Sequence, residues 1–392
     1  MGIRLDGTTD TISAPGSDLN LGQSGDSVKV ASEVRLPTAG PLSNRNIFVN
    51  GGARIAQRGT SETGITGSAY QTVDQFKTSI SSLGTWTVTQ STDAPAGFSN
   101  SFKMDCTTAD ASPSSGAVAA LDTFIEAQDL QVLEYGSSSA VAATLSFYVK
   151  SNKTGSGTVS ILQPDNSERC LNVSYTISTA NTWERKTISL PADASGVINN
   201  DTGRGLGMEF WLNSGSTYTG GSAQNTWGSL TQSNRNFANL GVGGSTDDYW
   251  MITGVQLEVG SQATPFEHRS YADDLQRCLR YCYVLGSQNP SNNYERFDFG
   301  ICSSSTVTRI ICRHPVQMRV APTVSVPDAS KFQISNTSNS YDISAISRMD
   351  NVAGPLTTSL SCTHSSGATS GAIYLIERNG DQLGRIIFSS EL

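Results

Sequence analysis

Hydrophobic and polar residues alternate along many short segments of the chain, which predicts β-strands with one buried and one solvated face. Between residues 143 and 149, for example, Leu, Phe and Val alternate with Thr, Ser and Tyr. Such segments recur at short intervals separated by turn residues, as a β-sandwich requires. The segments with this pattern are 85–90, 101–106, 117–124, 143–149, 158–163, 167–177, 183–190, 205–212 and 249–259.

A second and smaller group of strand patterns follows, which predicts a small C-terminal β domain over residues 286–392. Its segments are 297–302, 306–313, 323–326, 332–334, 359–362, 372–377 and 384–388, and the stretches 288–293, 335–341 and 363–370 are polar enough to be loops. At the other end, residues 46–57 (NIFVNGGARIAQ) predict a strand, an NGG turn and a second strand that open the large domain.

Between the two groups, residues 250–283 predict a closing strand, an extended arm and the one clear helix of the chain. Gly260 and Pro265 bound the arm, because neither residue favours continuation of a ladder. Ser270 is the predicted N-cap, with two aspartates in the first turn and two arginines in the last, which suits the helix dipole. The predicted fold is therefore mainly β: a jelly-roll sandwich over 46–265, a linker helix within 266–285, and the C-terminal domain.

Residues 1–45 carry short alternating patterns separated by Gly, Pro and Asp, and they are too polar to bury a core of their own. We expect an extended segment that attaches the protein to something larger.

Composition restricts the function. The chain has 392 residues, of which 15% are charged, and its net charge is −8 with no block of Lys or Arg. A nucleic-acid-binding surface is therefore not expected. No run is long enough to span a bilayer, and the N-terminus lacks the apolar region of a secretory signal. We expect a protein that is made in a cytoplasm, is not inserted in a membrane, and leaves the cell by another route.

The seven cysteines are odd in number and thinly spread, so a disulfide framework is not predicted. Cys278 and Cys282 are four residues apart and are expected on one face of the helix. Buried thiols are the favoured interpretation, because the three histidines lack zinc-type spacing.

Three stretches together resemble a family of bacteriophage tail-fibre, appendage and other virion structural proteins. They are NIFVNGGARIAQRGTS, WMITGVQLEVGSQATPFEHRSYADDLQRCLRYCY and HPVQMRVAPTV, and their order is also similar. The resemblance implies a jelly roll similar to carbohydrate-binding modules, a homotrimeric adhesin, and a place in the virion. It also implies that residues 1–45 bind other virion proteins.

The helix gives the trimer independent support. Three helices around an axis would bury an apolar stripe that one copy leaves open, and the residues of this stripe are Tyr271, Leu275, Cys278, Leu279 and Cys282. The alternative is that each helix packs against its own jelly roll or C-terminal domain.

No arrangement of residues predicts an enzyme or a bound cofactor. A G-x-S-x-G elbow is missing, and neighbours on a strand, such as Asp247 and Asp248, point to opposite faces. If these two aspartates lie in a loop they offer oxygen ligands for a structural calcium ion, although a solvated acidic loop is favoured.

Sugar recognition uses aromatic faces beside polar groups, since a pyranose stacks its apolar side on a ring. The segment 211–237 provides the candidates Trp211, Tyr218, Trp227 and Arg235, with Trp227 in the most polar surroundings. The alternative for Trp227 is a ring tucked over the edge of the sandwich. Trp86, Trp183 and Trp250 lie in strand patterns and are expected in the core.

Two functions remain after this reading. The first is a homotrimeric tail fibre or appendage that attaches to a host surface glycan. The second is a capsid decoration or head-fibre protein with a mainly structural role. In both, the protein is part of a virion.

Overall fold

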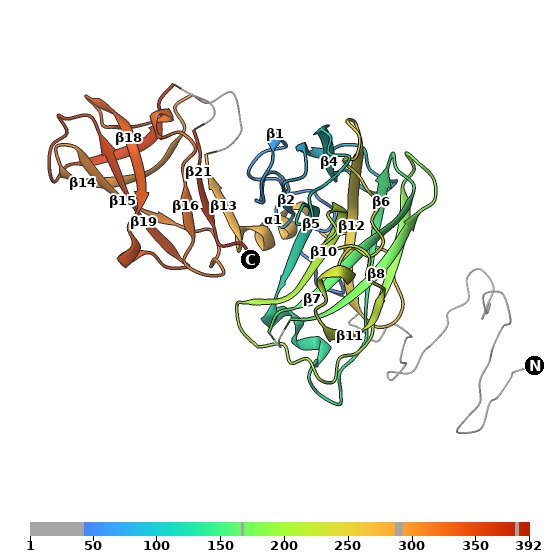
Figure 1. Ribbon diagram of the computed structural model, residues 1–392. Helices are drawn as coiled ribbons and strands as arrows, with labels where there is room; N and C mark the ends of the chain where they lie inside the picture. The colour runs from blue at the N-terminus through green and yellow to red at the C-terminus, as the bar shows by residue number, and fades with distance from the viewer. Residues whose placement is uncertain (1–42, 166–167, 287–292, 381–383) are drawn as a thin grey trace, which may run out of the picture.

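The computed structural model describes residues 43–165, 168–286, 293–380 and 384–392. It is mainly β: a two-sheet sandwich, one α-helix and a smaller C-terminal β domain follow one another along the chain, which confirms the predicted fold class (Figure 1). The predicted attachment segment lies outside the described residues, apart from its last three positions.

Two six-stranded sheets form the sandwich, and every pairing between neighbouring strands is antiparallel. The first sheet has the order β1-β3-β4-β12-β6-β9: β1 Ser61–Ile65, β3 Thr85–Ser91, β4 Ser101–Thr108, β12 Tyr249–Val259, β6 Ala143–Ser151 and β9 Glu184–Leu190. The second has the order β11-β8-β7-β10-β5-β2: β11 Gln224–Ser229, β8 Arg169–Ile177, β7 Gly155–Gln163, β10 Arg204–Ser214, β5 Val118–Glu126 and β2 Lys77–Ser81.

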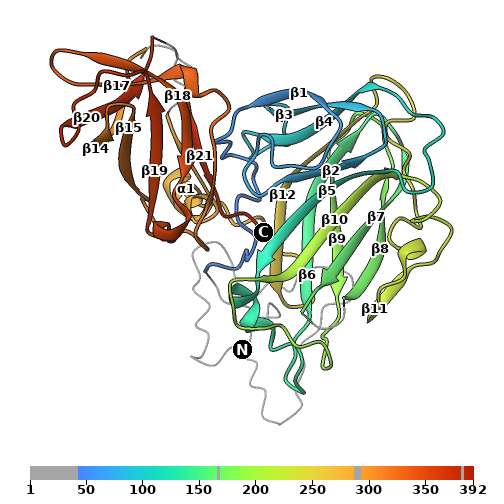
Figure 2. The ribbon, with the colours of Figure 1, turned by 60° about the vertical axis from the view of Figure 1, so that its left-hand side comes forward.

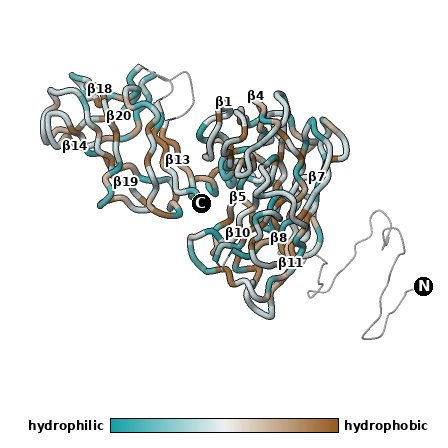
Figure 3. Tube along the Cα trace, viewed as in Figure 1, coloured by the Kyte–Doolittle hydropathy of each residue, from teal (hydrophilic) through white to brown (hydrophobic). Residues whose placement is uncertain are grey.

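The sandwich core forms because alternate residues of each strand point between the sheets. Phe147 of β6 meets Phe210 of β10 edge-to-face at 5.1 Å, and Phe210 lies 6.0 Å from the ring of Trp250 on β12. Trp86 and Trp250 are fully buried, as predicted, whereas Trp183 is only half-buried and donates from Nε1 to Asp93. Figure 3 shows hydrophobic and hydrophilic segments interleaved along the strands.

The C-terminal domain is a closed barrel beside a small sheet. The barrel has the order β14-β15-β19-β18-β17-β20: β14 Arg296–Ser304, β15 Val307–Arg313, β19 Thr357–His364, β18 Ser340–Arg348, β17 Phe332–Ser335 and β20 Ile373–Arg378. The sheet has the order β13-β21-β16: β13 Cys282–Leu285, β21 Ile386–Ser389 and β16 Thr323–Ser325. Four short 3-10 helices complete the described elements: η1 Ala127–Leu133, η2 Gln232–Asn234, η3 Ala329–Lys331 and η4 Asp350–Val352.

The helix α1 (Tyr271–Leu279) begins and ends within its predicted range. The hydroxyl of Ser270 accepts from the backbone N–H of Asp273 at 3.1 Å, so the predicted N-cap is confirmed. The prediction was wrong about Cys282, which opens strand β13 and therefore does not share a helical face with Cys278. All seven cysteines are free and buried, as expected of small apolar side chains.

The apolar stripe predicted on α1 does not form a continuous exposed face. Cys278 and Cys282 are fully buried within one chain, and Leu275 and Leu279 are half-buried. Tyr271 is exposed and lies under the guanidinium of Arg54 at 5.7 Å. The stripe therefore packs mainly within its own chain, which is the alternative that the sequence left open.

Charged side chains join the sandwich to the C-terminal domain. Arg58 pairs with Glu391 at 3.1 Å and lies 3.8 Å from Asp74, and Tyr70 donates to the carbonyl of Leu392. The chain end consequently lies between the two domains in both views (Figure 2). Burial raises the pKa of Asp74 to about 6 and that of Glu391 to about 7, while Arg58 partly offsets both shifts.

Some elements escaped sequence prediction. Residues 46–57 form a turn with extended flanks, and the two predicted strands are absent. The side chain of Asn50 makes the hydrogen bonds to the backbone that a partner strand would otherwise make. Its Oδ1 accepts from the N–H of Arg54 and of Ile55, and its Nδ2 donates to the carbonyl of Ile55. The pattern also missed β1, β2, β11, β13 and β18, all of which are largely polar, short or edge strands.

Candidate functional site

Three of the four predicted glycan-binding residues meet on the outer face of the second sheet. Trp211 of β10 lies 5.0 Å from Tyr218, ring to ring, and the guanidinium of Arg235 lies over both rings, at 5.1 and 5.4 Å. Trp211 faces outward because its neighbours Phe210 and Leu212 point into the core.

This group is closed rather than open to a ligand. Trp211 is only 1% exposed, and Arg235 forms a two-bond ion pair with Glu209. The segment between β11 and β12 covers it: Ser160 donates to the carbonyl of Arg235, and Thr158 to that of Ala238. We therefore correct the expectation for Trp211, whose ring offers no free face for stacking.

Trp227 lies apart from these residues, at the edge of the sandwich. Its indole N–H donates to the carbonyl of Pro191 at 2.8 Å, and its ring packs edge-to-face on Tyr135 at 5.8 Å. The ring is half-buried and contacts the core. The ring of Trp227 therefore packs over the edge of the sandwich, which was the alternative to a glycan-binding role.

Two carboxyl groups face each other across neighbouring strands of the same outer face. Asp122 of β5 is registered opposite Glu209 of β10, and both residues are buried. Burial, and then the charge of Glu209, raise the pKa of Asp122 to about 7. Because Arg235 already holds the carboxylate of Glu209, the pair is built into the structure of the face.

One of the two predicted calcium ligands, Asp248, is engaged in other contacts. The carboxylate of Asp248 accepts from the N–H of Gly243 and of Ser245, and it lies 3.4 Å from the ammonium of Lys153. Among the described residues there is no group of three His, Cys, Asp or Glu side chains placed to hold a metal ion. Asp248 therefore closes a turn, and its hydrogen-bond donors take the place that a cation would need.

A more open candidate lies where the sandwich meets the start of α1, and we call it the aromatic pocket. It encloses about 280 Å³. The rings of Phe98, Phe266 and His268 form one wall, with pairwise centroid distances of 4.9–5.1 Å. Tyr148 continues the row of rings at 5.4 Å from Phe98. The complete lining is Gly52, Arg54, Gly97, Phe98, Ser99, Phe266, His268, Arg269 and Asp274.

Local turns bring Phe98 to this wall. It ends a tight turn in which its N–H donates to the carbonyl of Pro95, and Gly97 has a φ of +90°. Glycine takes that conformation without strain, whereas a residue with a Cβ does so at a cost.

The arm between β12 and α1 carries the other two rings. Pro265 keeps it out of the ladder, and side chains of β12 fix it instead. Gln256 accepts from the N–H of Glu267, and Glu258 accepts from the N–H of Thr264. Hydrogen bonds to β12 thus hold the backbone that carries Phe266 and His268.

Asp274 is the unusual group of the pocket. Its side chain is only 10% exposed, and the nearest cation is Nη1 of Arg54 at 3.7 Å, beyond hydrogen-bond distance. Within the described chain its carboxylate has no hydrogen-bond donor. Burial raises the pKa of this carboxyl, with Arg269 and Arg54 opposing the shift. Because no described group donates a hydrogen bond to this carboxylate, the pocket is suited to a ligand that brings hydroxyl or amine donors.

Sequence reasoning missed this pocket because its residues come from three separate stretches. One signal was present: Phe266 and His268 lie in the arm of the recognised 250–283 stretch, where the turn chemistry keeps large side chains out of a strand. Only the fold brings Phe98 and Arg54 to them.

Comparison with known proteins gives a fold-level likeness only. No known protein family matches the sequence, and no curated protein matches it either. Similar solved structures include the enzymatically active domain of tailspike protein 4 of bacteriophage CBA120, with 14% identity and a TM-score of 0.30 over 55% of this chain. This chain spans about a fifth (21%) of that tailspike chain.

Two further similar structures have names that refer to sugar or carbohydrate binding. A putative sugar binding protein from Bacteroides thetaiotaomicron has 12% identity and a TM-score of 0.31, covering 55% of this chain and all (100%) of its own. A family 16 carbohydrate-binding module has 11% identity and a TM-score of 0.22, covering 43% and 84%. Scores of this size carry no functional assignment. The described part of the chain contains no helix with the length and apolarity to cross a bilayer.

Proposed function

We propose that the protein binds a glycan on a host surface through the aromatic pocket. The observation that carries this proposal is the carboxylate of Asp274, which lines the pocket beside three aromatic rings and accepts no hydrogen bond within the described residues. A pyranose matches both features, since its apolar face stacks on a ring and its hydroxyls donate to a carboxylate. Arg54, next to Asp274, supplies donors for the ring or hydroxyl oxygens of the sugar.

Substitution of the pocket tests the proposal. We expect Asp274→Ala to weaken glycan binding by roughly tenfold or more, because a hydrogen bond to a charged group contributes about 1.5–3 kcal/mol. We expect a similar loss in Phe266→Ala, because it removes a ring on which the sugar stacks. Binding is measured on a glycan array, followed by titration of the best ligand and by adsorption to host cells. Thermal unfolding of each variant shows that the fold is kept.

Trp227→Ala is the matched control, because it removes an aromatic ring of the same sandwich outside the pocket. If both pocket variants bind like the wild type, the pocket is not the site. Loss in Trp227→Ala alone would move the site to the sandwich edge. The proposed role is binding without catalysis, so wild-type protein should leave the length of the bound polymer unchanged.

We further propose that the protein is a virion appendage and a homotrimer, with residues 1–45 attached to other virion proteins. Its three stretches similar to phage appendage proteins support the first part. An apolar barrel face supports self-association: Phe299, Ile301, Ile311 and Ile373 are each 58–61% exposed, and Ile301 is registered opposite Ile373. Together they offer roughly 400 Å² of apolar surface, within the range of the largest patch on a typical monomer. A second copy is the occupant we propose for this face.

Electron microscopy of intact particles tests place and assembly together. We expect three copies per appendage on the tail, with the apolar barrel face covered by a neighbouring copy. Copies on the capsid would favour the decoration or head-fibre alternative. A solution mass near 41.5 kDa at micromolar concentration, measured by light scattering, would contradict the trimer.

A further inference from the structure

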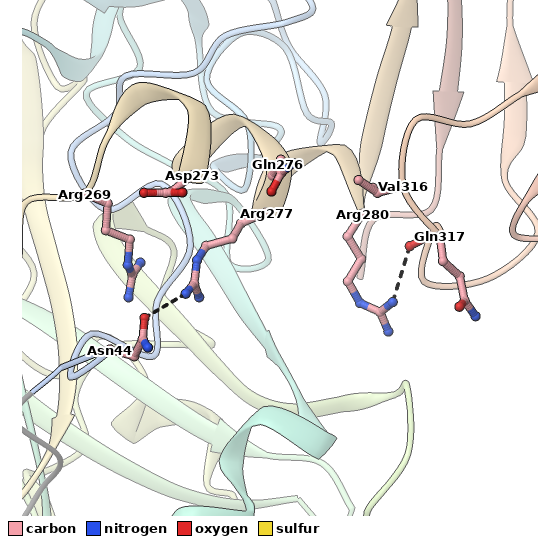
Figure 4. Close-up of a pocket in the computed structure, with 8 residues that line it drawn as sticks. All are labelled: Asn44, Arg269, Asp273, Gln276, Arg277, Arg280, Val316 and Gln317. Carbon is pink, nitrogen blue, oxygen red and sulfur yellow. Dashed lines mark hydrogen bonds between the residues drawn. The ribbon is translucent and has the colours of Figure 1, made fainter.

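A second cavity lies along α1, and we call it the arginine pocket (Figure 4). It encloses about 560 Å³ between α1, the segment at Asn44 and the loop at Val316 and Gln317 of the C-terminal domain. Three guanidinium groups point toward it, those of Arg269, Arg277 and Arg280. The cavity therefore brings three guanidinium groups together in a chain whose net charge is −8.

The three arginines differ in how far their donors are satisfied. Arg280 is held by two hydrogen bonds to Glu126, at 2.6 and 2.8 Å. Arg269 donates from both terminal nitrogens, to the carbonyls of Phe48 and Asn46 and to Glu267, but its buried Nε has no partner in the described chain. Arg277 makes one hydrogen bond, from Nη2 to Oδ1 of Asn44 at 3.1 Å. Most of the five donors of Arg277 are therefore available.

Two carboxylates lie at or near the cavity, and each accepts hydrogen bonds from groups other than Arg277. Asp273, which also lines it, accepts from the hydroxyl of Ser270 at 2.6 Å. Glu267 accepts from the N–H of Arg45 and of Asn46 as well as from Arg269. No carboxylate of the described residues forms an ion pair with Arg277.

The charge of Arg277 acts on the neighbouring guanidinium of Arg269. Burial, and then the charge of Arg277, lower the pKa of the Arg269 guanidinium, while Glu267 and Asp274 act in the opposite direction. Only 8% of the Arg269 side chain is exposed. Two repelling guanidinium groups at one cavity are stabilised when an anion lies between them.

We propose that the arginine pocket is an oxyanion-binding site, in which Arg277 is the main ligand and Arg269 supplies the second positive charge. The ligand group is a carboxylate or a phosphate, whose oxygens match the planar fork of a guanidinium. This inference goes beyond the proposed function, because the aromatic pocket needs only a neutral sugar. In a surface polymer the group would be the acid of a hexuronate or a phosphodiester.

Titration of the full-length protein with two probes tests the site and separates the two sources. The probes are inorganic phosphate and sodium acetate, neither of which has a sugar ring that could stack in the aromatic pocket, and binding is measured by calorimetry at low ionic strength. We expect saturable binding of at least one probe, a loss of at least tenfold in Arg277→Gln, and weakening by added salt. The probe that binds more tightly identifies the source.

Arg309→Gln is the matched control, since Arg309 is exposed on β15 and its replacement changes the net charge equally. Arg277→Lys keeps the charge but lacks the fork, and we expect it to recover only part of the affinity. Equal losses in Arg277→Gln and Arg309→Gln would overturn the proposal, as would absence of saturable binding by the wild type.

The two sites fail independently in these experiments. If the arginine pocket binds anions, Phe266→Ala retains that binding, whatever the outcome of the glycan assay. Conversely, Arg277→Gln retains binding of a neutral glycan if the aromatic pocket is the sugar site. Loss of anion binding in Phe266→Ala would contradict the separation of the two sites.

Discussion

Replacement of Glu126 by alanine should lower the free energy of unfolding by about 3 kcal/mol, because it removes the buried anion that joins the two domains. Glu126 ends β5 of the sandwich and has no exposed side-chain surface. It accepts two hydrogen bonds from Arg280 and one, at 2.9 Å, from the hydroxyl of Tyr281. The value lies at the low end for a broken buried pair, since 26% of the Arg280 side chain is exposed and water can solvate it.

The measurement is chemical denaturation followed by fluorescence and by circular dichroism, with the midpoint compared at unchanged slope. The control is Asp350→Ala, which removes the partner of Arg348 in an ion pair of 2.6 Å. The Asp350 side chain is 76% exposed, so its loss should cost less than about 1 kcal/mol. A cost for Glu126→Ala no larger than that of Asp350→Ala would show that the junction does not depend on this pair.

Replacement of Trp250 by alanine should cost about 3–5 kcal/mol, the range for large aromatic residues removed from a core. Trp250 is fully buried in β12, the strand paired with both β4 and β6, and its ring lies against Phe210. Its Nε1 also donates to the hydroxyl of Tyr175 at 3.0 Å. The substitution therefore opens a cavity and leaves a buried hydroxyl without its donor.

Two further tryptophan variants separate these causes. Trp250→Phe fills most of the cavity and loses only the hydrogen bond, so its cost should be about 1–2 kcal/mol. Trp227→Ala removes a half-buried ring at the sandwich edge and should cost less than half as much as Trp250→Ala. Similar midpoints for Trp250→Ala and Trp227→Ala would mean that the intersheet core is not centred on Trp250.

Most strands of both domains followed from local patterns, because burial on one face of a sheet imposes a period of two on the sequence. The closing strand was predicted with its observed bounds, Tyr249–Val259, and the cap of α1 with its observed hydrogen bond. Strands without that pattern were missed. Ser340–Arg348 is one, where only Ile343 is fully buried, and Gln224–Ser229 is an edge strand with no fully buried residue.

The candidate site was much less predictable than the fold. The aromatic residues of 211–237 suggested sugar binding by composition. In the fold, however, the segment between β11 and β12 covers Trp211 and buries its ring. The stripe on α1 suggested a trimer seam, yet Cys278 is buried inside one chain. Exposure of a side chain depends on what covers it, and the covering segment is distant in sequence or follows an irregular path.

The sequence by itself determined the fold class, the order of the two β domains and the position of the helix, since each rests on local periodicity, turn residues and caps. Only the tertiary structure decided which rings are open to a ligand and which charges lack a partner. Phe98 lies far in sequence from Phe266 and Asp274, which themselves belong to the arm and to α1. The three line one pocket because hydrogen bonds hold the arm against β12. The arginine pocket likewise needs the segment at Asn44, α1 and the C-terminal domain, because its walls come from all three.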